Sequence, residues 1–411
     1  MSRGILLPIA LCVLASTCDD AVGPGGPPGG VQEPIETLPR ELSPQELVLI
    51  DAGNDFTFDL FGRLVREEPD ENVFVSPLSV SMVLGMLLNG AAGETQSEIE
   101  TALGLSALTL DEINRAYRDL IDLLLGLDRS VETRVANSIW IREGFPVVPE
   151  FLDTNREFFG AEVAGLDFDD PGSVERINGW VEEETNGRIK QIIDMIRPEH
   201  VMFLINAMYF KGLWQIPFDK DDTRPAPFRR ADGSEVQVQM MTVDSLFANN
   251  VTDRYHAVDL PYGGGAFSMT IVLPAEGVAT ADLVAALDAP AWRTLIEGLH
   301  PQFLQVSLPR FELEYEKTLN ETLQELGIRK AFGDADFSRL TPGGGVWLDY
   351  VKQKAFVKVD EAGTEAAAAT VGAIAVSAPP PFLADRPFVF AIRERLSGTI
   401  LFVGQVTDPS R

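Results

Sequence analysis

Cysteine is almost absent from this chain of 411 residues, which holds only two. Both of them, Cys12 and Cys18, lie at the extreme N-terminus. This placement excludes a disulfide framework and a cysteine-ligated metal site in the folded body. Histidine is similarly scarce, and His200 stands next to Glu199 without a partner at metal-ligand spacing. We interpret His200 as a loop residue, and we expect neither a metal nor any other cofactor.

Positive charge is also in short supply. Lys and Arg number 33 against 62 Asp and Glu, which gives a net charge of −29. A chain this acidic is a poor candidate for binding nucleic acid or an anionic membrane through its overall field. The apolar share of 45% is ordinary for a globular protein with a sizeable core. We therefore expect a globular domain with no nucleic-acid partner.

The sequence motifs of common enzymes are missing as well. No nucleophile elbow, phosphate loop or zinc-binding helix motif occurs. The triple glycines at 263–265 and 343–345 are not followed by Lys-Ser, so we interpret both as turns. No set of nucleophile, base and orienting residue can be assembled. We assign no catalytic residue and predict that the protein is not an enzyme.

The N-terminus has the features of an export signal. The apolar run over residues 5–15 is too short to span a bilayer but fits the apolar part of a secretory signal. We predict a signal peptide over 1–17. The residues before Cys18 resemble a bacterial lipoprotein signal, although Ala15 and Thr17 depart from its preferred pattern. Two alternatives stay open: a membrane anchor on Cys18, or plain export to the periplasm or the extracellular space.

A tether and one large domain follow the signal. Residues 18–37 contain a Gly/Pro-rich stretch that cannot bury apolar surface, so we predict a disordered tether there. No linker divides residues 38–411, which we interpret as one domain. Capping boxes predict helix starts at Ser43, Thr109 and Thr318. Strand patterns come later, over residues 267–273, 354–359, 388–392 and 400–403. Helices early and strands late predict an α+β fold.

The segment 360–370, DEAGTEAAAAT, is the most informative part of the sequence. Composition alone favours an alanine-rich helix or a low-complexity linker. However, a β-branched strand leads into the segment, and three prolines at 379–381 follow it, which no helix interior tolerates. As a continued strand, the segment would place small side chains on one face, where they could enter between existing strands without overpacking a core. These side chains are Thr364, Ala366, Ala368 and Thr370.

This segment closely resembles the hinge of the reactive-centre loop of the serpins, a family of serine protease inhibitors. The hinge residues are Glu361, Gly363, Thr364, Glu365, Ala366, Ala367, Ala368, Ala369 and Thr370. Further collinear matches to the family lie at 72–79, 178–189, 206–214, 308–311, 386–388 and 402–406. The chain is identified as a serpin of the inhibitory type, with a leader that suggests a bacterial secreted or lipoprotein member.

The resemblance implies a fold and a mechanism. The fold is α+β, with three β-sheets, eight or nine helices and an exposed reactive-centre loop at about 361–382. In the implied mechanism, a serine or cysteine protease cleaves this loop. The hinge then inserts into the central sheet as a new strand before the acyl-enzyme hydrolyses, and the protease is trapped. The hinge of this chain fits insertion, because Glu365, its one charged residue after Gly363, would face away from the core.

The resemblance also assigns residues that hold the sheet closed. These shutter and breach residues are Ser76, Ser79, Asn206, Trp214 and Gln353. The family usually has a histidine at the position of Gln353, which commonly acts with an asparagine that matches Asn206. Glutamine both donates and accepts, so we expect a substituted hydrogen bond there.

Two ways of counting along the loop predict the position of the cleaved bond, and they differ by one residue. Counting from Glu361 places it after Ser377 and before Ala378, whereas counting back from Pro387 places it between Val376 and Ser377, which we favour. Either choice offers a small uncharged residue, so the expected partner is an elastase-like or subtilisin-like serine protease with a small apolar pocket. We expect a monomer. The alternative is a non-inhibitory binding or carrier protein with the same fold.

Overall fold

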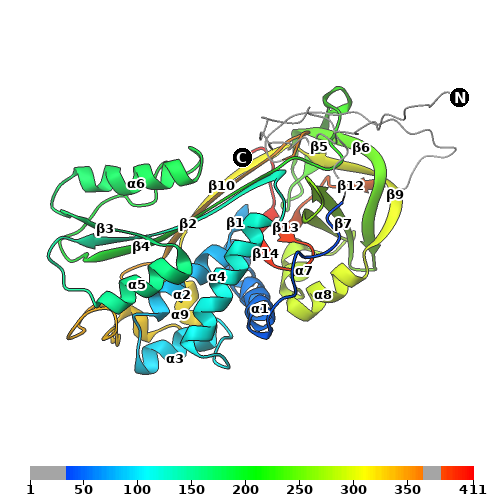
Figure 1. The fold of residues 1–411 in the computed structure, drawn as a ribbon. Helices are drawn as coiled ribbons and strands as arrows, with labels where there is room; N and C mark the ends of the chain where they lie inside the picture. The colour runs from blue at the N-terminus through cyan, green and yellow to red at the C-terminus, as the bar shows by residue number, and fades with distance from the viewer. Residues whose placement is uncertain (1–33, 364–380) are drawn as a thin grey trace, which may run out of the picture. The chain divides into compact units, whose positions relative to one another are not determined.

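The computed structural model describes residues 34–363 and 381–411 (Figure 1). Residues 34–411 form one compact unit. The predicted signal peptide, most of the tether with Cys18, and the loop from Thr364 to 380 lie outside the described residues. At the start of the described chain, the Ile35 N–H donates to the Gly264 carbonyl at 2.8 Å, so the end of the predicted tether contacts the domain.

Nine α-helices occur among the described residues. They are α1 (Pro44–Glu67), α2 (Pro77–Leu88), α3 (Gly93–Ala102), α4 (Leu110–Gly126), α5 (Pro149–Phe159), α6 (Gly172–Glu184), α7 (Thr280–Ala285), α8 (Ala289–Glu297) and α9 (Asn320–Glu325). None of these helices is long and apolar enough to cross a membrane. Two of the three predicted starts are confirmed: capping boxes on Ser43 and Thr109 begin α1 and α4.

The third predicted start is wrong. Thr318 is the last residue of a strand, and α9 begins after Leu319 with no side-chain cap. The backbone N–H of Leu319 instead donates to the carbonyl of Val351 at 2.7 Å. This long-range contact, which no local motif records, sets the boundary.

The strands form three sheets within the described part of the chain. The largest has nine strands: β1 (Val73–Val75), β5 (Arg224–Arg229), β6 (Glu235–Val251), β7 (Tyr255–Tyr262), β8 (Phe267–Pro274), β9 (His300–Pro309), β12 (Pro381–Leu383), β13 (Phe388–Glu394) and β14 (Ile400–Val406). The order is β1-β14-β13-β8-β7-β6-β9-β12, and β5 pairs with β6. The four strands expected from alternation or short apolar runs are confirmed as β8, β11 (Lys352–Val359), β13 and β14.

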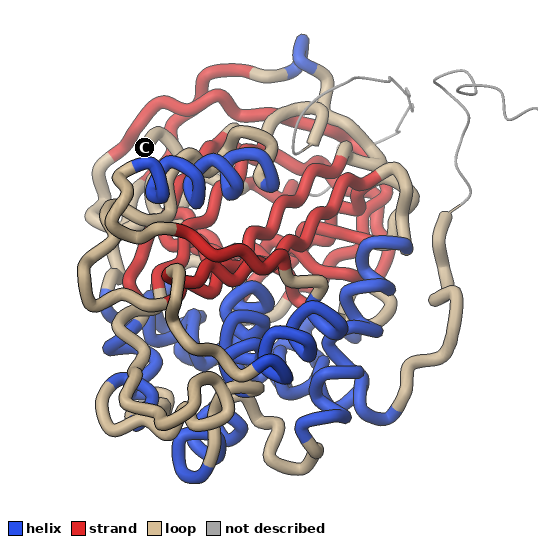
Figure 2. The backbone as a smooth tube through the Cα atoms, turned by 60° about the vertical axis from the view of Figure 1, so that its left-hand side comes forward, coloured by secondary structure: helices blue, strands red, loops and turns tan. Residues whose placement is uncertain are grey.

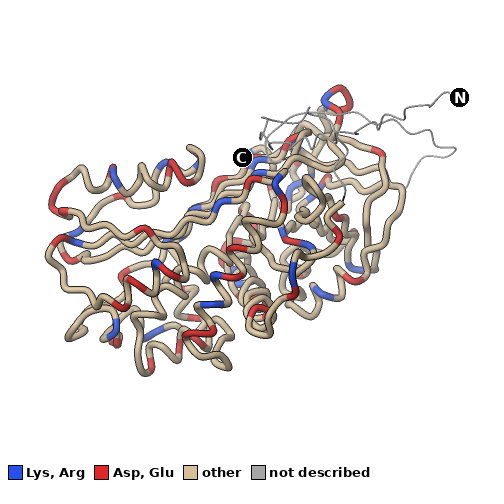
Figure 3. The backbone as a smooth tube through the Cα atoms, viewed as in Figure 1, with Lys and Arg blue, Asp and Glu red and all other residues tan. Residues whose placement is uncertain are grey.

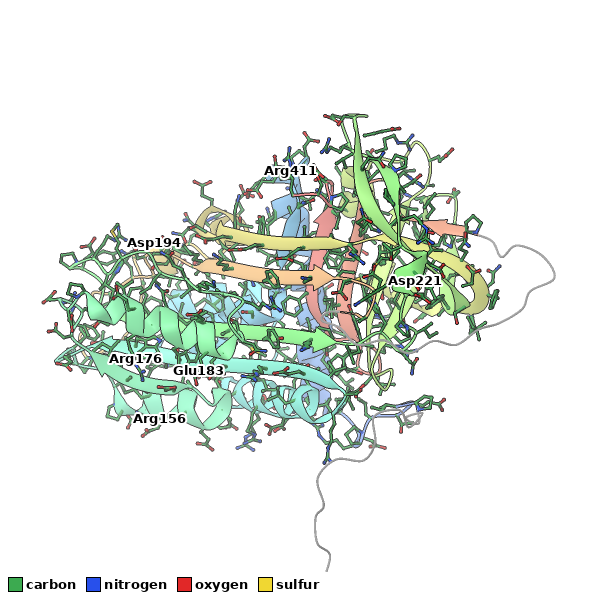
Figure 4. All side chains as sticks on the ribbon, turned by 90° about the horizontal axis from the view of Figure 1, so that it is seen from above. Arg156, Arg176, Glu183, Asp194, Asp221 and Arg411 are labelled. Carbon is green, nitrogen blue, oxygen red and sulfur yellow. The ribbon has the colours of Figure 1, made fainter. Side chains whose placement is uncertain are left out.

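The two smaller sheets position the functional site. One contains β3 (Glu162–Leu166), β2 (Val131–Arg142) and β4 (Met202–Gly212), and the other pairs β10 (Phe311–Thr318) with β11. Seen from above, β10, β11, β4 and β2 run side by side in one layer (Figure 4). No backbone ladder joins β4 to β11 among the described residues, so each is an edge strand facing the other. We call the gap between them the slot.

Hydrophobic packing differs on the two faces of this layer. The main core lies between the layer and the helix group that contains α2 and α4. A second, smaller cluster joins α6 to the opposite face through Trp140, Trp180 and Phe203. Figure 2 shows most helices gathered on one side of the strands and a single helix across from them. The slot is therefore bounded by packed structure on both faces.

Charges pair along the strands beside the slot. Lys354 of β11 contacts Glu314 of β10 at 2.6 Å, and Lys358 contacts Glu312 at 3.5 Å. These lysines of β11 thus lie opposite glutamates of β10, and basic and acidic segments lie close together there (Figure 3). These cross-strand pairs hold β11 to β10 on the side away from the slot.

Candidate functional site

The upper end of the slot holds the root of the predicted hinge. The Trp214 indole N–H donates to the Asp360 carbonyl at 2.9 Å, and its backbone N–H donates to the Ala362 carbonyl at 2.8 Å. The indole is buried and stacks on Tyr262, with ring centroids 4.4 Å apart. Trp214 therefore fixes the backbone on which the reactive loop begins.

Glu361 anchors the same root through its carboxylate. The side chain is buried and accepts hydrogen bonds from Arg310 Nε at 2.6 Å and from Thr223 Oγ1 at 2.5 Å. Burial alone would raise the pKa of Glu361, but the hydrogen bonds from Arg310 and Thr223 outweigh it and leave the pKa below its ordinary value. The carboxylate is thus held charged, and it ties the hinge to β10 and to the segment before β5.

Gly363 is the last described residue before the loop, and only glycine fits its position. Its φ is +136°, a region that other residues rarely adopt. A Cβ there would lie 2.3 Å from the carbonyl oxygen of Gly212. Gly363 forms antiparallel bridges with Leu213 and with Asp360. The chain therefore leaves β11 through a tight turn and arrives beside the end of β4.

Below the root, the slot contains a cavity of about 450 Å³. It is lined by both edge strands, by the start of α2 and by the chain leading into β11; among the lining residues are Ser76, Ser79, Val80, Asn206, Met208, Gln353 and Ala355. Val80, Met208 and Ala355 among them belong to the main core. The gap between the sheets is thus an internal space and not merely a break in a ladder.

The floor of the cavity is set by the start of α2. Ser76 caps this helix by accepting the Ser79 backbone N–H at 3.2 Å. Its hydroxyl donates to the Leu401 carbonyl of β14 at 2.8 Å, which ties α2 to the largest sheet. Ser76 and Ser79 are both buried. These serines therefore act in this structure by positioning the helix beneath the slot.

Asn206 and Gln353 face this cavity from opposite edges. Gln353 Nε2 donates to the Ser76 carbonyl at 2.7 Å, and Asn206 Nδ2 donates to Asn137 Oδ1 at 2.9 Å. The expected substituted hydrogen bond of Gln353 therefore exists, but its partner is Ser76 and not Asn206. The remaining side-chain oxygens, Asn206 Oδ1 and Gln353 Oε1, are buried and find no hydrogen-bond partner among the described residues.

The similarity to known proteins decides the family. A family model described as Serpin (serine protease inhibitor) matches residues 51–409. The chain belongs to the serpin family. This is a family of protease inhibitors, which confirms the prediction that the chain is not an enzyme.

Individual serpins resemble this chain over most of its length. Glia-derived nexin of Rattus norvegicus is 32% identical, covering 88% of this chain and 94% of the relative. Neuroserpin of Homo sapiens is 34% identical, covering 87% and 91%. A crystal structure of human thyroxine-binding globulin complexed with thyroxine superimposes with a TM-score of 0.81 at 30% identity, covering 89% and 99%. The predicted serpin fold is thereby confirmed, with three sheets and nine α-helices in the described residues.

The structure brings together some of the sequence-predicted site residues of this serpin. Glu361, Gly363 and Trp214 meet at the hinge root, and Ser76, Ser79, Asn206 and Gln353 meet at the cavity. The remaining predicted residues, Thr364 to Thr370, Val376, Ser377, Ala378 and Cys18, lie outside the described residues. No group of His, Cys, Asp and Glu in the described ranges could hold a metal ion.

Sequence reasoning missed two partners of the hinge, Arg310 and Thr223. No spacing rule connects residue 310 to residue 361. The antiparallel register of β10 and β11 does so, because it pairs Phe311 with Val359 and brings Arg310 beside the hinge root. The signal available in the sequence was an acidic residue, Glu361, directly after a strand pattern, since a carboxylate that becomes buried there requires a partner.

Proposed function

We propose that this serpin is an inhibitor that is consumed by its target, a serine protease or, as the alternative, a cysteine protease. The protease cleaves the reactive loop, and the hinge enters the slot between β4 and β11 as a strand that traps the acyl-enzyme. The supporting feature is the pair of facing edge strands with a cavity between them. Each edge carries backbone groups without ladder partners, which an added strand would satisfy.

One observation carries the proposal, and it concerns strand register. Gly363 already forms bridges with Leu213 and with Asp360. Because both bridges are antiparallel, each step forward along the hinge is a step back along its partner strand. Seven residues after Gly363 is Thr370. Seven residues before Leu213 is Asn206, and seven before Asp360 is Gln353. A strand continued in this register would therefore bring Thr370 between the two residues whose side-chain oxygens lack partners. Its hydroxyl is a donor that one of those oxygens could accept.

The same register suits the rest of the hinge. Residues that alternate with Thr370 pair with Met208 and Phe210, whose side chains are buried in the main core. The loop offers alanine at these positions, namely Ala368 and Ala366. Small side chains entering a packed core avoid the cost of overpacking. Glu365 falls on the opposite face, away from this core.

The target follows from the residues at the cut. We place the cleaved bond between Val376 and Ser377, with the bond between Ser377 and Ala378 as the alternative. No basic residue lies between Glu361 and Ala384, so a trypsin-like pocket finds no charge to bind. We propose an elastase-like or subtilisin-like serine protease as partner of a monomeric inhibitor. Export, either secreted or anchored through a lipid on Cys18, would place it among such proteases.

The test is to incubate the chain with a pancreatic-type elastase and with subtilisin, followed by denaturing gels and intact mass. A covalent complex at the summed mass, with release of the C-terminal peptide, is expected. Thr364→Arg should abolish the complex and leave plain cleavage, because a charge on the inward face stalls insertion. Glu365→Arg is the matched control, since that residue faces outward, and it should keep the complex. Equal complex formation by both variants would contradict the proposal.

A second candidate is a non-inhibitory carrier. It is favoured by the likeness to thyroxine-binding globulin, which was crystallised with bound thyroxine. In that case, cleavage of the loop would yield no complex with any protease of the elastase or subtilisin type. The cleaved chain would also show no gain in stability.

A further inference from the structure

We propose that Arg197, His200 and Asp349 form a latch across the far end of the slot, and that this latch must open before insertion is complete. The latch would set how often a cleaved molecule traps its protease and how often the protease escapes. This inference rests on the proposed inhibitory function. The latch residues are distinct from the hinge residues and from the two serines beneath the cavity.

The latch joins the two segments that lead into the edge strands. His200 lies two residues before β4, and Asp349 lies three residues before β11. His200 Nε2 is 3.2 Å from Asp349 Oδ2, and the Arg197 guanidinium contacts the same oxygen. The Arg197 backbone N–H donates to His200 Nδ1 at 3.2 Å, and Arg197 Nε donates to His200 Nε2 at 3.0 Å, so Arg197 contacts both His200 and Asp349.

Packing holds the imidazole of the latch in place. His200 is only 7% exposed, and its ring meets those of Phe203 and Tyr350 edge-on, with centroids 5.2 and 5.9 Å away. Phe203 belongs to β4, and Tyr350 leads into β11. His200 thus touches both sides of the slot. Its position is fixed by burial on each side, so Asp349 meets an imidazole that is already oriented.

The segment between α6 and β4 carries a second tie to β11. Asp194, labelled in Figure 4, contacts Lys352 Nζ at 2.8 Å. The guanidinium of Arg188 lies over the ring of Phe356, 5.2 Å from its centroid. Together with the latch, these contacts fasten the α6–β4 connection to β11 at three places. The connection therefore spans the slot at the end opposite the hinge root.

The register of the hinge brings the end of the inserted strand to the latch. Counting thirteen residues onward from Gly363 gives Val376, and thirteen back from Leu213 gives His200. Val376 is the residue that we expect to hold the acyl bond. A strand placed between two others separates them by two strand spacings, about 9–10 Å. The direct contact between His200 and Asp349 would have to give way at the last step of insertion.

The latch therefore acts on a competition between two rates. After cleavage, the acyl-enzyme is either hydrolysed or trapped, and trapping requires insertion to finish first. A closed latch slows the final step and lets more molecules be cleaved without trapping. A weakened latch should raise the fraction that traps. The latch lies at the end of the slot opposite the hinge root, so we expect the initial cleavage rate to stay unchanged.

The experiment uses Asp349→Asn in the full chain, with the protease that gives a complex with the unmodified chain. The measured quantity is the consumption ratio, the number of inhibitor molecules consumed per trapped protease, which equals one when every cleavage traps. We expect the excess of this ratio over one to fall on the order of twofold to fivefold, because a partly exposed ion pair has an effect of that size. The unfolding temperature of the intact chain should fall, while that of the loop-cleaved chain stays the same. Arg197→Gln, which alters the exposed partner, should act in the same direction.

The matched control is Glu325→Gln, which removes an exposed carboxylate paired with Arg63 at 3.0 Å; neither residue lines the cavity of the slot. It should leave the consumption ratio unchanged. If Asp349→Asn lowers the stability of intact and cleaved chains equally and leaves the ratio unchanged, the latch is merely structural and the inference is wrong. If the unmodified chain forms no complex, the proposed function fails and the inference fails with it.

Discussion

Asn206 and Gln353 face one cavity from opposite edge strands, and each buries a side-chain oxygen that accepts no hydrogen bond from the described part of the chain. A buried polar group without a partner costs about 1–3 kcal/mol. These two oxygens lie at the place where the register of the hinge would bring Thr370. We expect insertion to relieve part of this cost, which contributes to the drive for the change.

Thr370→Val tests this relationship with little change in shape. The intact chain should keep its stability, while the loop-cleaved chain should lose about 1–2 kcal/mol, because the inserted strand no longer offers a hydroxyl to Asn206 or Gln353. Chemical denaturation of both forms measures the difference. A loss of equal size in the intact chain would show that Thr370 acts elsewhere.

Gly363→Ala should loosen the hinge root. The added Cβ would meet the Gly212 carbonyl at 2.3 Å, and the φ of +136° disfavours any residue with a side chain. We expect the intact chain to be destabilised by about 1–3 kcal/mol and the loop to be cleaved faster by a non-target protease. Gly277→Ala is the control, since that glycine has a positive φ but no atom within 4 Å of its Cβ position. Equal effects of both changes would contradict the account of close approach.

Glu361 should give the hinge root a dependence on pH. Its pKa is lowered in the folded chain, because hydrogen bonds from Arg310 and Thr223 outweigh its burial. Its contribution is therefore complete above the unfolded value of 4.5 and is lost as the pH falls through the folded pKa. The gap in unfolding free energy between the unmodified chain and Glu361→Gln should be about 1–2 kcal/mol at pH 7 and should shrink below about pH 4.5. A gap that does not change with pH would show that the charge plays no part.

A buried ion pair within the largest sheet predicts a separate stability effect. Asp259 and Arg393 are both buried and lie 3.1 Å apart, and the Asp259 carboxylate also accepts from Ser268 and Thr270. Asp259→Ala would leave the Arg393 charge unpaired, at a cost of about 3–5 kcal/mol in unfolding free energy. Asp385→Ala, at a more exposed ion pair, is the control and should cost far less. A small loss from Asp259→Ala would mean that water reaches Arg393.

Much of the fold was predictable, because local signals and the resemblance agreed. Neighbouring residues alone specify the capping boxes at Ser43 and Thr109 and the apolar alternation in β8 and β11. The start predicted at Thr318 failed because a backbone contact to Val351 fixes that boundary. Such contacts join residues that are distant in sequence, and no local pattern specifies them.

The candidate site likewise divides into features that the sequence predicts and features that long-range contacts determine. The hinge and the residues of the shutter came from motif resemblance, while their bonding partners came from strand register. Gln353 bonds to the Ser76 carbonyl and not to Asn206, because the two edge strands stand apart around the cavity. The latch was invisible in the sequence, where His200 had no partner nearby. Asp349 reaches it only after the chain has folded the two segments together.

The most direct test of the central claim is the unfolding temperature of the chain before and after its loop is cut by a protease that forms no complex. The account predicts a large rise on cleavage, because the freed hinge gains ladder hydrogen bonds to both β4 and β11. It also predicts that Thr364→Arg removes most of the rise. An unchanged unfolding temperature in the cleaved, unmodified chain would contradict insertion and leave the carrier role as the better explanation.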